Sequence, residues 1–314
     1  MMISQKNLKW MVVAALSAVI VSGCSKGGTV AGVEDKELQK VELDHIHGMS
    51  YSADGNKLFF ASHDGLRIYA QGQWIQPAGE KHDYMGFSMV SDGFYSSGHP
   101  APGSSKKNPF GIVKSVDEGR SFESLALYGE VDFHGMSVGY ESHAIYVFNP
   151  EANSAMKSIG LHYSVDEANS WTQSAMIGLE GKPMALAVHP TEKAIVAVGT
   201  DQGVFVSEDF GQQFKKITPA MQVSALHFNV GGKLLAAGME NQAVLTRMDL
   251  DGNHAEKFRI PSMTQDAIAF IAQNPLNESE LTIMTFGNDA YYSSDNGDTW
   301  TKIIDKGIGV SGQK

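Results

Sequence analysis

The sequence predicts an all-β fold, a single β-propeller built from four-stranded blades. Two internal repeats predict it: a polar turn motif that occurs four times, and a short run of alternating apolar residues that occurs six times. The apolar runs recur about every 44 residues, close to the usual propeller blade of roughly 40 to 50 residues. The 33 glycines, together with short clusters of β-branched and aromatic residues, are typical of many short strands joined by tight turns.

The turn motif reads Ser-x-Asp-x-Gly-x-Ser/Thr-aromatic, with single departures. Its copies are Ser115–Phe122, Ser164–Trp171, Ser207–Phe214 and Ser293–Trp300, with the aspartates Asp117, Asp166, Asp209 and Asp295. Aspartate accepts bonds from backbone amides inside a turn, and glycine supplies a positive φ, so these aspartates are expected to be structural. They lie 49, 43 and 86 residues apart. Because 86 is twice 43, a degenerate copy is expected near residues 249–252.

The apolar runs are expected to form the innermost strand of each blade, where small residues let neighbouring sheets crowd around the axis. They are His47–Tyr51, Met85–Met89, His134–Val138, Met184–Val188, Ser224–Phe228 and Ile268–Ala272. Six runs predict six blades. Seven blades would require a further blade in the tail after Trp300 or in the insert at residues 97–110.

The first residues have the layout of an export signal. Lys6 and Lys9 precede an apolar stretch from Trp10 to Val21, which is too short to cross a bilayer as a helix. The stretch leads to Cys24, the one cysteine of the chain. The segment from Val21 to Cys24 resembles the lipobox of bacterial lipoproteins, which implies cleavage before Cys24 and lipid on its thiol. The alternative is an ordinary signal peptide with an unrelated cysteine.

These features divide the chain into four expected parts. They are a signal peptide (1–23), the lipidated cysteine with a flexible tether (24–40), the propeller (41–305) and a C-terminal tail (306–314). The expected location is therefore outside the cytoplasm, on a membrane of the cell envelope. The sequence leaves open whether this is an inner or an outer membrane, and it leaves the oligomeric state open.

The net charge of the chain indicates which kinds of partner it can bind. Lys and Arg total 24 against 35 Asp and Glu, and the net charge of −11 repels phosphate backbones, which argues against nucleic acid. One cysteine excludes an internal disulfide. The expected partners are the membrane, through Cys24, and a protein or glycan ligand.

In a propeller of this kind the inner strand begins, and the second strand ends, on one face near the axis, while the repeated turns lie on the opposite face. Six histidines of the first three blades fall at such positions: His45, His47, His63, His82, His99 and His134. Imidazole suits copper and zinc, and Met49, Met85 and Met136 would add the sulfur that copper accepts. Copper is therefore the first expectation and zinc the second. The alternatives are histidines that bond backbone carbonyls and methionines that fill the core.

The repeated turns resemble the Asp-box of sialidase-like (BNR) repeats, so a glycoside hydrolase is a second hypothesis. Sialidases clamp a carboxylate with three arginines, and the four arginines of this chain do not reproduce that triad. Another glycosidase could use paired carboxylates. The candidates near the histidines are Asp64, Asp83, Asp132 and Asp266, and the sequence does not decide whether any is catalytic.

Over residues 41–305 the chain resembles bacterial BNR-repeat lipoproteins that are commonly called glycosyl hydrolases. The segments that carry this resemblance are His45–Gly48, Ser62–Gly65, Asp92–Pro100, Asp132–Met136 and Tyr146–Asn149. More distantly the chain is similar to photosystem II assembly propellers and sortilin-type receptors, which use the boxes as scaffold. The resemblance implies architecture more than activity.

The sequence therefore predicts a membrane-anchored envelope propeller that binds a ligand or a transition metal on its histidine-rich face. Two alternatives stay open: a glycoside hydrolase that uses carboxylates of that face, and a non-catalytic protein-binding or assembly scaffold.

Overall fold

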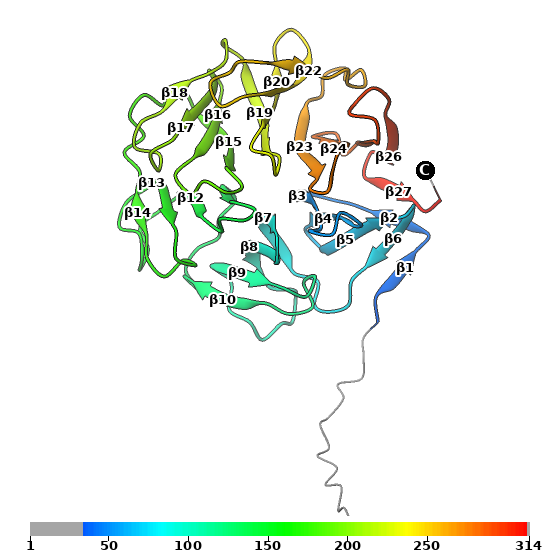
Figure 1. Cartoon of the computed structure of the whole chain (residues 1–314). Helices are drawn as coiled ribbons and strands as arrows, with labels where there is room; N and C mark the ends of the chain where they lie inside the picture. The colour runs from blue at the N-terminus through cyan, green and yellow to red at the C-terminus, as the bar shows by residue number, and fades with distance from the viewer. Residues whose placement is uncertain (1–33, 313–314) are drawn as a thin grey trace, which may run out of the picture. The chain divides into compact units, whose positions relative to one another are not determined.

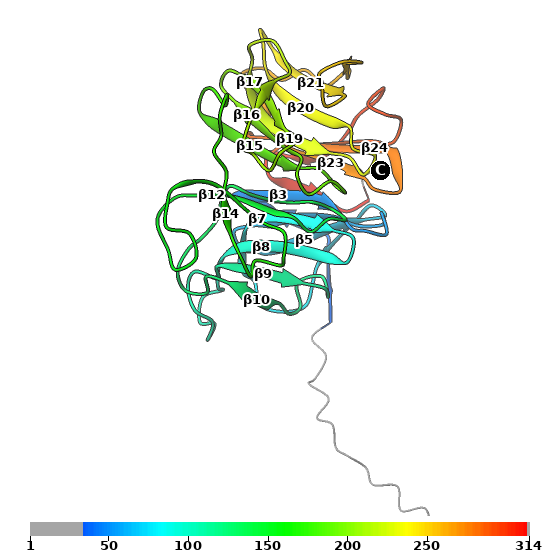
Figure 2. The same ribbon diagram turned by 60° about the vertical axis from the view of Figure 1, so that its left-hand side comes forward.

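The computed structural model describes residues 34–312, and all regular secondary structure in this range is β-strand. The strands form six sheets arranged around a central axis, as Figures 1 and 2 show. The predicted six-bladed propeller is confirmed. The predicted signal peptide, the lipidation site Cys24 and most of the predicted tether lie outside the described residues. Within residues 34–312 there is no helix with the length and hydrophobicity that a membrane crossing requires.

In the first three blades the strands follow one another from the axis outward in chain order. Blade one consists of β3 (Ile46–Tyr51), β4 (Leu58–Ser62), β5 (Gly65–Ala70) and β6 (Gln73–Gln76), with β1 (Lys36–Leu38) at its outer edge. Blade two consists of β7 (Asp83–Val90), β8 (Gly93–His99), β9 (Ile112–Ser115) and β10 (Glu123–Ala126). Blade three consists of β11 (Met136–Val138), β12 (Ile145–Asn149), β13 (Gly160–Ser164) and β14 (Thr172–Gln173).

The last three blades keep the same order. Blade four consists of β15 (Pro183–Val188), β16 (Val196–Thr200), β17 (Gly203–Ser207) and β18 (Lys215–Lys216). Blade five consists of β19 (Gln222–Phe228), β20 (Leu234–Met239), β21 (Ala243–Met248) and β22 (Glu256–Lys257). Blade six consists of β23 (Ile268–Asn274), β24 (Asn277–Thr285), β25 (Ala290–Ser293) and β26 (Thr301–Asp305), followed by β27 (Ile308–Val310) and β2 (Lys40–Glu42) at its outer edge.

The predicted apolar runs contain or overlap the innermost strands β3, β7, β11, β15, β19 and β23. Small residues permit these strands to crowd around the axis. A side-chain carbon at Gly48 of β3 would lie 2.6 Å from Cβ of Phe87 in β7, closer than two unbonded carbons can approach. The apolar core is divided accordingly into clusters that each fill the space between two neighbouring blades.

The two ends of the described chain close the ring. β2, near the N-terminal end, pairs with β27 at the outer edge of blade six, and β1 pairs with β6 at the outer edge of blade one. The propeller therefore extends beyond its expected limits of 41–305, because the expected tether (24–40) and the expected tail (306–314) both supply strands to it. Edge strands of three residues are too short to show the alternating apolar pattern by which strands are found in a sequence.

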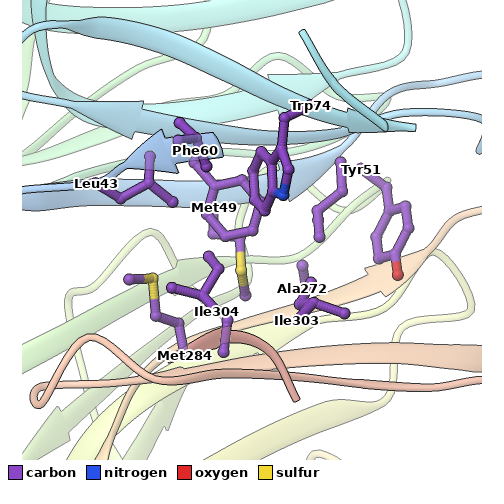
Figure 3. Packing of buried hydrophobic residues seen from close by; sticks show 12 residues of the cluster. Leu43, Met49, Tyr51, Phe60, Trp74, Ala272, Met284, Ile303 and Ile304 are labelled. Carbon is purple, nitrogen blue, oxygen red and sulfur yellow. The ribbon is translucent and has the colours of Figure 1, made fainter. Parts of the chain in front are cut away.

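Trp74 of β6 fills the junction where the ring closes. It is fully buried, and its ring centroid lies 5.4 Å from that of Phe60 and 4.9 Å from that of Tyr69. Figure 3 shows it among the buried side chains of blade one, with Ile304 and other residues of blade six opposite. Gly309 of β27 makes room for the indole, since a side-chain carbon there would approach it to 2.6 Å. Trp74 therefore joins blade one, blade six and β27.

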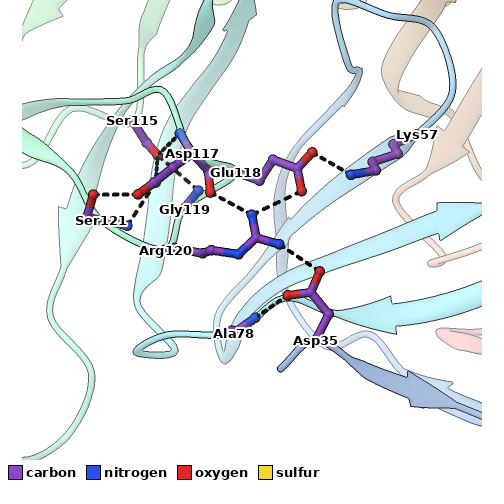
Figure 4. Close-up of polar contacts among 9 residues, drawn as sticks. All are labelled: Asp35, Lys57, Ala78, Ser115, Asp117, Glu118, Gly119, Arg120 and Ser121. Atoms are coloured by element: carbon purple, nitrogen blue, oxygen red, sulfur yellow. Dashed lines mark hydrogen bonds and ion pairs between the residues drawn. The ribbon is translucent and has the colours of Figure 1, made fainter. Parts of the chain in front are cut away.

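The four repeated turns join the third strand of a blade to the fourth, in blades two, three, four and six. In blade two, Ser115 Oγ donates to Asp117 Oδ1 and accepts the amide of Gly119, both at 2.9 Å. Asp117 Oδ1 also accepts the amide of Ser121 at 2.9 Å, as Figure 4 shows. The other three copies repeat these bonds. The degenerate copy expected at residues 249–252 lies in the corresponding turn of blade five.

Ion pairs fasten the start of the described chain to blade two. The carboxylate of Asp35 accepts a bond from Arg120 at 2.7 Å and one from the amide of Ala78 at 2.9 Å. Lys57 pairs with Glu118 on the same turn, as Figure 4 shows. Each such solvent-facing pair stabilises a protein by about 1 kcal/mol or less. The bonds of Asp35 therefore orient the segment before β1, and the Lys57–Glu118 pair links the β3–β4 connection of blade one to the same turn.

Trp74→Ala is expected to lower the free energy of unfolding by about 3 to 5 kcal/mol, the usual cost of removing a buried aromatic side chain. Denaturation by urea, followed by circular dichroism, measures the change. Ile159→Ala, which truncates a side chain that is 68% exposed, is the control and is expected to change stability by less than about 0.5 kcal/mol. A Trp74→Ala variant as stable as the wild type would show that the ring does not depend on this junction.

Candidate functional site

Seven of the predicted site residues gather where the inner strands of blades one to three begin. We call this region the histidine face. It consists of His45, His47, His63, Asp83, His99, Asp132 and His134. Antiparallel pairing brings them there, because it sets the end of a second strand beside the start of the inner strand. Ser62, next to His63, pairs with Ile46, and His99 pairs with Asp83.

His47, His63 and Asp83 form the first set of this face. Nδ1 of His63 lies 2.7 Å from Asp83 Oδ2, and Nε2 of His47 lies 3.4 Å from Asp83 Oδ1. One nitrogen or oxygen atom from each of the three residues lies within 4.8 Å of the other two, and no further group of this kind is found in residues 34–312. Such separations let one metal ion reach all three atoms after small rotations of the side chains.

Burial distinguishes the members of the first set. The side chain of Asp83 is 7% exposed, whereas that of His63 is 67% exposed. Nε2 of His47 and Oδ1 of Asp83 are buried and have no hydrogen-bond partner. A buried polar atom without a partner costs about 1 to 3 kcal/mol. The first set therefore holds two buried atoms that lie 3.4 Å apart and form no hydrogen bond.

The protonation of His47 suits metal binding. Burial lowers the pKa of His47 below its usual value, and the neighbouring His134 and His63 act in the same direction, while the charge of Asp83 acts against it. The ring of His47 is therefore neutral at pH 7. Neutral imidazole is the form that coordinates metal ions.

His99, Asp132 and His134 form the second set. Nε2 of His134 lies 2.9 Å from Asp132 Oδ2, and Nε2 of His99 lies 3.2 Å from the same oxygen. Nδ1 of His99 lies 2.6 Å from Oδ1 of Asn108, a residue of the β8–β9 connection that no sequence pattern singles out. The ring centroids of His134 and His47 are 6.4 Å apart. The two sets therefore form one continuous cluster.

Two of the six candidate histidines join neither set. His82 is buried among aromatic rings, with centroids 5.0 Å from Phe110 and 5.4 Å from Phe122, and its Nδ1 accepts the amide of Ala101. Burial lowers its pKa, which keeps it neutral. His45 stands at the exposed edge of the face, with its ring centroid 6.4 Å from that of His63. The geometry assigns a packing role to His82.

Two of the four candidate carboxylates also lie outside the sets. Asp64 binds Arg67 with an oxygen–nitrogen distance of 2.5 Å. Asp266 accepts the amides of Ala267 at 2.8 Å and Gly287 at 3.1 Å. Both carboxylates are engaged in bonds that shape turns. Asp83 and Asp132 are the candidate carboxylates that contact histidines.

The methionines expected beside the histidines are buried in the blades. Met49 and Met136 belong to apolar clusters between neighbouring blades, and Figure 3 shows Met49 among buried apolar side chains. Met85 is buried as well. The contacts within the histidine face are made by nitrogen and oxygen atoms.

A cavity of about 590 Å³ lies along the axis, and His47 and His134 are part of its lining. Three polar residues of blades five and six, Ser224, His227 and Gln273, also line it. Ser224 Oγ and Gln273 Oε1 are buried without a hydrogen-bond partner, and burial lowers the pKa of His227 to about 4. None of the three is among the candidates that the sequence predicts. For Ser224 and His227 the available signal was a polar side chain within the inner-strand repeat Ser224–Phe228, and Gln273 follows the repeat Ile268–Ala272 directly.

The comparisons with known proteins find similarity of structure and none of sequence. No protein-family model and no curated protein matches the sequence. Among solved structures, the chain is similar to the GH74 xyloglucanase from Xanthomonas campestris, with a TM-score of 0.54, 14% identity and coverage of 86% of this chain and 46% of that one. For the GH74 enzyme from Niastella koreensis the values are 0.53, 12%, 85% and 47%. The chain thus spans about half the length of these enzymes.

A third similar structure is YCF48 bound to D1 peptide, with a TM-score of 0.50, 14% identity and coverage of 86% of this chain and 83% of that one. Identities this low show a common fold and do not transfer an activity. The comparisons therefore establish a β-propeller whose fold resembles those of GH74 enzymes and of YCF48.

His227 is expected to make stability depend on pH. Its pKa is about 4 in the folded protein against 6.5 for an ordinary histidine, so the unfolded chain binds the extra proton between these values. The free energy of unfolding should fall as the pH is lowered from 6.5 to 4, by on the order of 1 kcal/mol per pH unit. Urea unfolding across this range measures the slope.

His227→Gln should remove the part of that slope that one proton causes. His254→Gln changes a histidine whose side chain is 84% exposed and serves as the control, with the wild-type slope expected. The same slope in His227→Gln and the wild type would show that His227 is not held neutral by the fold.

Proposed function

We propose that this propeller binds a divalent transition metal ion through His47, His63 and Asp83. The observation that carries the proposal is the convergence of one nitrogen or oxygen atom from each residue within 4.8 Å. The three residues come from two neighbouring blades, so the tertiary fold brings them together rather than a local motif. Zinc is bound by such nitrogen and oxygen atoms at about 2.0 to 2.2 Å.

The unpaired buried atoms of the first set support the proposal. Nε2 of His47 and Oδ1 of Asp83 lie 3.4 Å apart, and neither makes a hydrogen bond. An ion between them would give both atoms a partner, and the charge of Asp83 would offset part of the charge of the ion. Because His47 is neutral at pH 7, its ring need not lose a proton when the ion binds.

The kinds of ligand favour zinc or copper(II). Imidazole suits these ions, whereas magnesium and calcium prefer sites made of oxygen atoms. With Met49 and Met136 in the core, the reason for ranking copper above zinc is gone. Three protein ligands leave a coordination position open to water or a further ligand. The exposed side of His63 makes that position accessible from solvent.

A glycoside hydrolase has less support. The similarity to the two GH74 enzymes covers about half of their length. Each of the four candidate carboxylates already bonds a cation, backbone amides or imidazoles. The YCF48 structure contains a bound peptide, and protein binding without a metal is the remaining alternative.

Full-length protein, purified in detergent and freed of metal, is expected to bind at least one zinc or copper(II) ion per chain. His47→Ala and Asp83→Asn should each weaken binding by more than about 100-fold, since loss of an outer-shell partner alone costs about 10- to 100-fold. Isothermal titration measures the affinity. His254→Ala removes an exposed histidine outside the site and should leave the affinity unchanged. Wild-type affinity in both first-set variants would refute the site.

We also propose that a lipid on Cys24 anchors the chain to a membrane of the cell envelope, because an apolar stretch that follows two lysines leads to this cysteine. Radiolabelled palmitate is expected to label the wild type in cells that process lipoproteins, and Cys24→Ser should remain unlabelled. Label on the Cys24→Ser variant would contradict the assignment of Cys24.

A further inference from the structure

We infer that the second set, His99, Asp132 and His134, binds a second divalent transition metal ion beside the first. The inference rests on the proposed function and extends it from a one-ion site to a two-ion site. Three features of the second set carry it: its place in the blade repeat, an unpaired carboxylate oxygen, and the orientation of the ring of His99.

The two sets are related by the repeat of the propeller. Asp83 begins the inner strand of blade two and contacts His63, which follows the second strand of blade one. Asp132 precedes the inner strand of blade three and contacts His99, which ends the second strand of blade two. The contact between carboxylate and imidazole in the first set therefore recurs one blade further along the chain.

The carboxylates of both sets are incompletely bonded. Oδ1 of Asp132 is buried and has no hydrogen-bond partner, and the same is true of Oδ1 of Asp83. Leaving such an atom unpaired costs about 1 to 3 kcal/mol, and more when the atom carries charge. A cation held by both oxygens of Asp132 would give Oδ1 its missing partner and stay next to Oδ2, the oxygen that the two histidines contact.

The ring of His99 is oriented for a cation. Oδ1 of Asn108 can only accept, so Nδ1 of His99 carries the hydrogen and donates across their 2.6 Å contact. Nε2 of His99 is then the ring atom that faces Asp132 Oδ2, at 3.2 Å. Either a proton on Nε2 or a metal ion between the two atoms stabilises this contact, and the measurements of bound metal below distinguish the two. A metal ion bonded to both atoms takes the place of that proton, and the Asn108 contact is of the kind that fixes metal-binding histidines.

The second set is less convergent than the first, because its three ligand atoms do not all lie within 4.8 Å of one another. Atoms that bind one ion at about 2.0 to 2.2 Å are roughly 3 to 3.5 Å from one another. Nε2 of His99 and Nε2 of His134 lie 3.2 Å and 2.9 Å from Asp132 Oδ2. Because both nitrogens contact the same oxygen, the rings must turn to admit an ion. The nearby first ion would also repel the second. The second ion should therefore bind more weakly than the first.

The number of ions per chain tests the inference. Metal-free full-length protein in detergent is titrated with zinc, and bound zinc is measured by elemental analysis after removal of free metal. The wild type should bind two ions in two steps, and Asp132→Asn should bind one. His134→Ala, which truncates a side chain that is 67% exposed and so leaves the core intact, should also bind one. His254→Ala should bind two.

Copper(II) gives a second measurement. Two neighbouring copper(II) ions broaden each other's electron paramagnetic resonance spectrum, so broadening is expected in the wild type and should disappear in Asp132→Asn.

Three outcomes of the zinc titration would overturn the inference. One zinc ion in the wild type, lost in Asp83→Asn and kept in Asp132→Asn, would rule out the second ion and leave the proposed function standing. Two ions that persist in Asp132→Asn and His134→Ala would overturn it as well. No ion in the wild type would remove both proposals.

Discussion

Closure of the ring is the constraint on which the rest of this structure depends. Blade one supplies His47 and His63 to the histidine face, and it is held by blade two on one side and by blade six on the other. The contact with blade six depends on short edge strands from both ends of the described chain and on Trp74. An open ring would let blade one tilt, and its histidines would move away from Asp83.

The histidine face collects buried charge that the fold alone does not fully satisfy. Two carboxylates stand among five imidazoles, and each keeps one buried oxygen without a hydrogen bond. Leaving a buried charged oxygen without a hydrogen bond is costly, and this is the basis on which a metal ion is proposed here. In the repeated turns, by contrast, the aspartate carboxylates are hydrogen-bonded, because serine hydroxyls and backbone amides donate to them. The motif that reveals the fold and the cluster that suggests a function are thus built on different principles.

The sequence predicts the fold well because the fold is repetitive. Inner strands and repeated turns recur in most blades, and each repeat supports the others. The closing strands escaped prediction because three residues carry too little pattern. Seven of the candidate residues lie together at one face, as the strand positions predict, whereas the ring of His82 turns toward Phe110 and Phe122. Convergence within 4.8 Å and the contact of Asn108 with His99 depend on how blades twist against each other, which residue spacing does not encode.

Anomalous X-ray diffraction at the zinc absorption edge, from crystals of the protein grown with zinc, tests the central claim most directly. The account predicts a strong peak between Nε2 of His47, a ring nitrogen of His63 and a carboxylate oxygen of Asp83. A zinc-loaded crystal without a peak at these three residues would contradict it.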